Sequence, residues 1–168
     1  MSRARPWLDL LALATLAALV VAFDGGLHRS PRLALVPAAL LGVVGGVAVG
    51  LALGAVPSSR AVRAACGSPT LLAVVGVLLF AAAAEEAVWR WAVLDGLGAV
   101  VGAAAAVSLS TLAFAAAHGR SRRAIGSHTL TGGTFGLAYL ATGRLAAAIG
   151  AHASYNLAVF ADDLRRRA

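Results

Sequence analysis

The chain has 168 residues, of which 60% are hydrophobic and only 12% are charged. A soluble domain carries roughly 25% charged residues, so this chain has too few polar side chains to cover a soluble core of its size. The formal net charge of +7 comes from arginines at the ends of apolar runs, where they set topology, so nucleic-acid binding is not expected. Cys66 is the single cysteine, which excludes an intrachain disulfide and a cysteine-based zinc site.

The predicted elements are apolar runs separated by glycine, proline or arginine. The first, Trp7 to Phe23, follows Arg3 and Arg5 like a signal peptide, but no small-x-small cleavage site ends it, so we expect an uncleaved span. At ~20 residues per crossing, the chain is expected to be an all-α integral membrane protein with about six transmembrane helices in one bundle. The second span is expected at about 33–56, and the third begins near residue 70. The fourth ends near residue 118, the fifth covers about 126–141 and the sixth about 145–161.

The arginines also orient the bundle. With the N-terminus inside, the outer segments hold only Arg29, Arg32 and Arg144, and Arg90 lies within a span. Cytoplasmic segments carry the excess of arginine in membrane proteins, so we expect both termini in the cytoplasm, in a bacterial plasma membrane. The inner segments hold Arg3, Arg5, Arg60, Arg63, Arg120, Arg122, Arg123, Arg165, Arg166 and Arg167.

Glycines predict two features of the packing. In the second span Gly42, Gly45, Gly46 and Gly50 form a stripe suited to close helix packing. Further on, the midpoint between Glu85 and His118 falls near Val101, flanked by glycines 98 and 102. A turn there would place both side chains about 24 Å below it, since each residue of a helix rises ~1.5 Å.

Glu85 and Glu86 lie inside an apolar run, with Arg90 one turn on. Ionisable groups at membrane depth cost a few kcal/mol each, so they usually face a protein interior and mark function. His118 ends the run that begins at Phe114, and His152 precedes Asn156 in the last span. Each of the pairs Glu86 and Arg90, Phe114 and His118, and His152 and Asn156 is spaced i to i+4, which puts its members on one helix face.

These residue types suit attack of water on an amide. A carboxylate among apolar helices can serve as general base, and Arg90 can hold Glu86 ionised, which leaves Glu85 for a water. The imidazoles of His118 and His152 can polarise that water, donate to a leaving amine or steady an oxyanion. The Asn156 amide adds a neutral donor of the kind found in oxyanion holes.

The ordered set Glu-Glu-x-x-x-Arg, Phe-x-x-x-His and His-x-x-x-Asn resembles the CPBP family of intramembrane proteases, which includes the CAAX prenyl endopeptidase and Abi-type proteins. The resemblance covers about residues 70–161. It implies that Glu85 activates the water with help from His118, that His152 and Asn156 bind the water or oxyanion, and that Glu86, Arg90 and Phe114 support the site. Where the family pattern has glycine after its arginine, this chain has Trp91. The short length resembles the compact myxosortase-like subset.

The resemblance also implies a division of the chain and a choice of mechanism. Residues 1–69 would hold the first two helices and their loops, 70–161 the CPBP-like protease core, and 162–168 a cytoplasmic arginine-rich tail. A metal-free glutamate mechanism with no cofactor is favoured, because no His-Glu-x-x-His helix is present. Should a divalent metal such as zinc act instead, its ligands would be Glu85, His118 and His152.

The predicted function is an intramembrane endopeptidase acting on a membrane-embedded or membrane-anchored peptide or protein, at a membrane-tethered or C-terminal hydrophobic segment. A non-proteolytic immunity or scaffold protein of the same family is the alternative. A small proton-coupled transporter would prefer inverted repeats and broken helices, and neither is evident. Outside the set we expect His28 and His128 at the membrane interface, Asp95 capping or ending a helix, and Asp162 and Asp163 exposed in the tail.

Overall fold

The computed structural model describes residues 32–56 and 69–167. The first predicted span, Trp7 to Phe23, and Cys66 lie outside these ranges, as does His28. Within them every regular element is helical and no strand occurs, which confirms the all-α prediction. The described ranges hold five helical rods, so the count of six spans and their arrangement in one bundle stay predictions.

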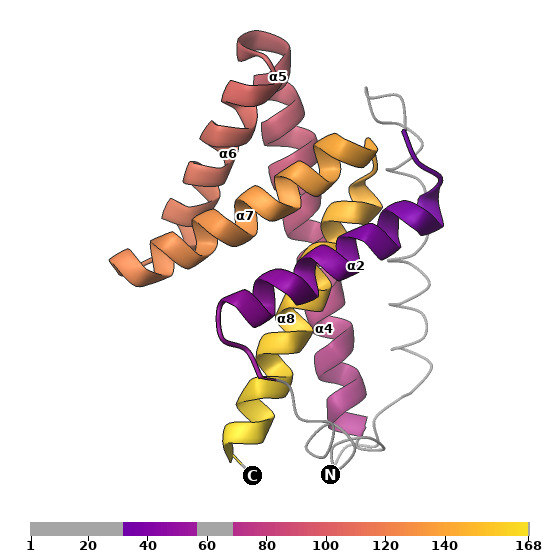
Figure 1. Ribbon diagram of the computed structural model, residues 1–168, viewed down its shortest axis with the longest axis vertical. Helices are drawn as coiled ribbons and strands as arrows, with labels where there is room; N and C mark the ends of the chain where they lie inside the picture. Colours follow the sequence, from indigo (N-terminus) through magenta and orange to yellow (C-terminus); the bar gives the residue numbers. More distant parts are fainter. Residues whose placement is uncertain (1–31, 57–68, 168) are drawn as a thin grey trace.

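The elements follow one another as mostly long helices with short connections (Figure 1). The helix α4 continues without a break through a π-helix, η1, into α5, and this run carries the glutamate pair. The bounds are α2 Leu35–Ala52, α4 Pro69–Glu86, η1 Ala87–Asp95, α5 Gly96–Val101, α6 Ala103–His118, α7 Arg122–Thr142 and α8 Leu145–Arg167.

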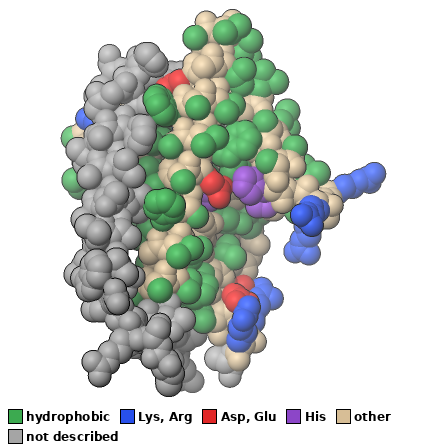
Figure 2. Space-filling view, turned by 180° about the vertical axis from the view of Figure 1, so that it is seen from behind, with side chains coloured by type: hydrophobic (Ala, Val, Ile, Leu, Met, Phe, Trp, Pro, Cys, Tyr) green, Lys and Arg blue, Asp and Glu red, His purple; other side chains and the backbone are tan. Residues whose placement is uncertain are grey.

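Apolar surface marks the protein as a membrane protein. Two helical segments of the described ranges, Leu35–Ala52 and Leu71–Val101, are long and apolar enough to cross a bilayer, and α6 is a shorter apolar helix. Large aliphatic side chains such as Val44, Val77 and Val100 are 66%, 66% and 82% exposed. Figure 2 shows hydrophobic side chains spread over the described part of one face. Lipid tails cover such a surface without the penalty that water would impose.

The glycine stripe of α2 packs directly on α8. A Cβ at Gly42 would collide with the carbonyl of Ala147, and one at Gly46 would collide with the carbonyl of Ala151. The Ser154 hydroxyl then donates to the carbonyl of Val43 at 3.1 Å, across the same contact. The predicted close packing is confirmed, because only glycine, which has no Cβ, lets the two helix backbones come this close together.

The turn between the two middle spans lies where the glycines predicted it. Gly102 separates α5 from α6 and has a φ of +80°, in a region that favours glycine. The α4–η1–α5 run and α6 therefore lie antiparallel and meet at the turn (Figure 1). This hairpin lets a residue near the end of α4 face the end of α6.

Two acidic residues were predicted at or beyond helix ends. The π-helix η1 ends at Asp95, as expected, but the Asp95 side chain caps no helix; its carboxylate accepts a 2.5 Å hydrogen bond from the buried Tyr139 hydroxyl of α7. Asp162 is not in an exposed tail, because α8 runs on to Arg167. The Asp162 side chain is largely buried and is paired with Arg165 and Arg166.

Candidate active site

A fully buried ion pair forms the inner half of the site. Glu86, the last residue of α4, accepts a 2.6 Å hydrogen bond from Nε of Arg90, and neither side chain has any exposed surface. The other oxygen of the Glu86 carboxylate lies 2.8 Å from Nδ1 of His152 on α8. Glu86 therefore joins two helices, and its acceptance of the Nδ1 proton leaves Nε2 of His152 as the nitrogen that can serve a water or substrate.

Arg90 has donors to spare. Its guanidinium carbon lies 5.6 Å from the centre of the Phe114 ring, and both Nη atoms are buried with no hydrogen-bond partner among the described residues. Arg90 also lies within η1. π-helices are rare in proteins, and those that occur are often found at functional sites. Buried donors without hydrogen-bond partners are uncommon in proteins, which makes Arg90 a candidate for a functional role as well as a packing role.

The outer half of the site is the pair of Glu85 and His118. Their Oε2 and Nε2 atoms are 3.2 Å apart, and the side chains are 37% and 32% exposed. Nδ1 of His118 lies 2.9 Å from the carbonyl oxygen of Phe114. A carbonyl can only accept, so Nδ1 must carry a hydrogen. Nε2 is therefore the ring nitrogen that faces Glu85.

Phe114 lies at the centre of the two halves. Its buried ring is 4.3 Å, centre to centre, from the His118 ring and 6.2 Å from the His152 ring. The His152 ring is stacked on Phe135 of α7 at 4.8 Å. The Phe114 ring thus packs against the rings of both histidines.

His128, which the sequence argument placed at the membrane interface, lies beside the predicted site residues. Its ring lies 5.5 Å from the His118 ring and 6.0 Å from the Phe114 ring. A signal was present: His128, Gly132 and Gly136 recur at i, i+4 and i+8, so they share one face of α7. That face packs on α6, where a Cβ at Gly132 would approach Phe114 at 2.8 Å.

Asn156 and the metal alternative receive no such support. Asn156 lies one turn after His152 on α8 and is partly buried, but the structure gives it no hydrogen bond to any described residue. The proposed zinc ligands are split, because Glu85 pairs with His118 whereas His152 pairs with Glu86. Among the described residues no group of three or more His, Cys, Asp or Glu side chains is arranged to hold a metal ion.

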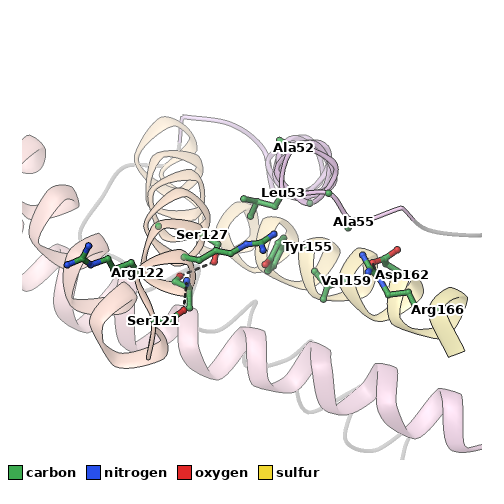
Figure 3. A pocket seen from close by; sticks show the side chains of 15 residues that line it. Ala52, Leu53, Ala55, Ser121, Arg122, Ser127, Tyr155, Val159, Asp162 and Arg166 are labelled. Carbon is green, nitrogen blue, oxygen red and sulfur yellow. Dashed lines mark hydrogen bonds and ion pairs between the residues drawn. The ribbon is translucent and has the colours of Figure 1, made fainter.

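A cavity of about 640 Å³ lies apart from these residues, between the end of α2, the start of α7 and α8. Figure 3 shows Tyr155, Val159, Asp162 and Arg166 following one another along α8 on one side of it. Ser121 and Ser127 line it from the start of α7. None of the predicted site residues lines this cavity.

Fold and site together define an all-helical membrane protein with paired glutamates and histidines between its helices. The sequence model of a family described as type II CAAX prenyl endopeptidase Rce1-like matches residues 67–158. The chain belongs to this family of proteases, as its three motifs predicted. No curated protein and no solved structure matches the chain significantly.

Proposed function

We propose that the chain is an intramembrane endopeptidase that hydrolyses a peptide bond by means of a water activated by Glu85. The observation that carries the proposal is the 3.2 Å contact between Glu85 and His118, partly exposed beside a fully buried Glu86 and Arg90 pair. One carboxylate is thus paired with a buried arginine, and the other faces an imidazole. Two carboxyl groups in such different surroundings suit different tasks.

In this mechanism Glu85 removes a proton from water while the water oxygen bonds to the carbonyl carbon of the substrate. His118 stabilises the carboxyl group that results, because its Nε2 faces Glu85 and its Nδ1 is held by the Phe114 carbonyl. The amide of Asn156 would donate to the developing oxyanion, and Nε2 of His152 would do so when that ring carries a proton on both nitrogens, because its Nδ1 proton is donated to Glu86. Donors held in place before the reaction are worth the most, and the Glu86 and Phe135 contacts hold His152.

The substrate we propose is a membrane-tethered peptide or a hydrophobic C-terminal segment. Acidic and histidine side chains lie together in the middle of the face seen in Figure 2, with hydrophobic side chains around them. Around Glu85 the exposed side chains of α4 and η1 are apolar, among them Phe80 and Val88 at 55% and 54%. A segment that lies in or on the bilayer would reach the pair over this surface. We also propose that both termini face the cytoplasm.

The full chain in liposomes can test this function with two probes. One is a farnesylated CAAX peptide with a fluorophore and quencher on either side of the bond to be cut, and the other is a set of single-span proteins with hydrophobic C-termini. We expect cleavage of at least one probe, incorporation of one ¹⁸O atom from labelled water into the new carboxylate, and a loss of about 10³-fold or more in Glu85→Gln.

Thr129→Ala serves as the matched control, because Thr129 lies on α7 and its hydroxyl bonds only to the backbone of its own helix. This variant should cleave like the wild type. If neither probe is cut, or if Glu85→Gln cuts as fast as the wild type, the endopeptidase proposal is wrong. A non-proteolytic immunity or scaffold role would then be favoured.

A further inference from the structure

His128 belongs to the same cluster as the motif residues, although it is in none of the three motifs. Its ring is within 6.0 Å, centre to centre, of both Phe114 and His118, and it is partly buried. It comes from α7, whereas the motif residues come from α4, η1, α6 and α8. His128 thus adds to the site a side chain from α7, a helix that carries none of the motif residues.

The position of His128 is fixed by the packing of α7 on α6. Gly132, one turn later, lies against the Phe114 ring so closely that a Cβ there would be 2.8 Å from Cδ1 of Phe114. The buried Thr131 hydroxyl donates to the backbone carbonyl of His128 at 3.3 Å, so this carbonyl has a side-chain hydrogen bond. Because Phe114 also positions His118, the two imidazoles are held by one shared ring.

His118 has both ring nitrogens engaged, one by the Phe114 carbonyl and one by Glu85. The ring of His128, in contrast, makes no hydrogen bond or ion pair to any described residue. Peptide hydrolysis moves two protons: one leaves the water, and one must reach the departing nitrogen. The Glu85 and His118 pair accounts for the first, and a free imidazole beside it is suited to the second.

We propose that His128 is the general acid that protonates the leaving amine. This inference rests on the proposed function. Glu85 takes one proton from water as the C–O bond forms. When the C–N bond breaks, its electron pair stays on nitrogen, which takes a proton from the His128 imidazolium. The partly exposed Glu85 then releases its proton to solvent and His128 regains one from solvent, so one water is consumed and no other reactant is needed.

A comparison of amide and ester substrates tests this role. The probe is the farnesylated CAAX peptide, used beside its depsipeptide analogue, in which an ester replaces the amide to be cut. An alkoxide leaves far more readily than an amine anion, so it depends less on a general acid. We expect His128→Gln to lower kcat for the amide by about 10²-fold or more while the ester is cut within a few-fold of wild type, with KM unchanged.

Chemical rescue separates a proton donor from a packing residue. In His128→Ala, added imidazole should restore part of the amide cleavage, whereas it should not restore Glu85→Gln. Thr129→Ala is the control on the same helix and should behave as wild type with both substrates. Thermal unfolding in detergent shows whether each variant is folded, and the ester rate of the same preparation shows that its site is assembled.

The outcomes distinguish this proposal from the proposed function. Without Glu85-dependent cleavage by the wild type, the endopeptidase itself is refuted, and the general acid with it. If the wild type cuts in a Glu85-dependent way but His128→Gln cuts the amide at the wild-type rate, His128 is not the acid. Equal losses on amide and ester without imidazole rescue would make His128 a packing residue and overturn the proposal.

Discussion

Glu85 and His118 meet at 3.2 Å across a hairpin whose turn is Gly102, while the neighbouring Glu86 points to another side of the helix and meets His152 at 2.8 Å. Adjacent residues of a helix point about 100° apart, so one glutamate pair serves two different histidines on two different helices. The site is therefore two carboxyl and imidazole pairs with the Phe114 ring between them. This division assigns separate tasks to side chains that are adjacent in sequence.

Glutamine in place of His118 should separate its hydrogen bonding from its proton chemistry. His118→Gln keeps a donor that can reach Glu85 but can neither accept nor pass on a proton. We expect kcat to fall by about 10²- to 10⁴-fold with little change in KM, as is typical of a lost acid or base. Initial rates with the farnesylated peptide would measure this. A His118→Gln variant with the wild-type kcat would contradict the assignment.

Removal of Glu86 should cost stability as well as activity. Glu86→Gln leaves the Arg90 cation buried without its counter-ion, and breaking a buried pair from one side costs about 3–5 kcal/mol. The double variant Glu86→Gln with Arg90→Met removes both charges and should unfold at a higher temperature than Glu86→Gln alone. Thermal unfolding in detergent measures both. If the second change lowers Tm further, the pair does not set the stability of this region.

The α2 and α8 contact offers a matched pair of glycines. Gly46→Ala should lower Tm, because the new methyl group would collide with the Ala151 carbonyl and the Ser154 hydroxyl, and overpacking costs about 1–3 kcal/mol. Gly45→Ala should be neutral, since its Cβ would lie 3.8 Å from the nearest atom, in Thr134. Equal Tm values for the two variants would show that the helices are not packed as closely as described.

Asp162 should give the end of the bundle a pH-dependent stability. Hydrogen bonds from Arg166 and Arg165 lower the pKa of Asp162 from its ordinary 3.8 to about 2. A pKa that is lower in the folded than in the unfolded state stabilises the fold above the unfolded value. The contribution is therefore complete above pH 3.8 and is lost as the pH falls towards 2. Tm measured against pH should drop less over this window in Asp162→Asn than in the wild type.

The glutamate mechanism predicts activity without a metal ion. Protein treated with a strong chelator, and shown by elemental analysis to be free of transition metals, should cleave its substrate at the untreated rate. The chemistry would then come from Glu85 and the imidazoles alone. Loss of activity on chelation, with recovery on addition of zinc, would instead support a metal bound by Glu85, His118 and His152.

Local sequence was enough for the features that depend on composition and helical period. The low fraction of charge predicted a helical membrane protein, because lipid demands internally satisfied backbone and tolerates apolar surface. Spacing of i to i+4 placed Glu86 with Arg90 on one face, and the structure has them 2.6 Å apart. The glycines near Val101 predicted the turn, since Gly102 adopts a φ that other residues avoid.

Only the tertiary structure decided which side chains on different helices meet. Periodicity fixes the faces of a single helix, but the rotation of one helix against another depends on side-chain packing along the whole contact. The pairing of His152 with Glu86, the burial of Asp162 and the approach of His128 to Phe114 across Gly132 all arise from that rotation. The sequence by itself therefore determined the class of protein and the residue types of its site, while helix packing decided how they are paired.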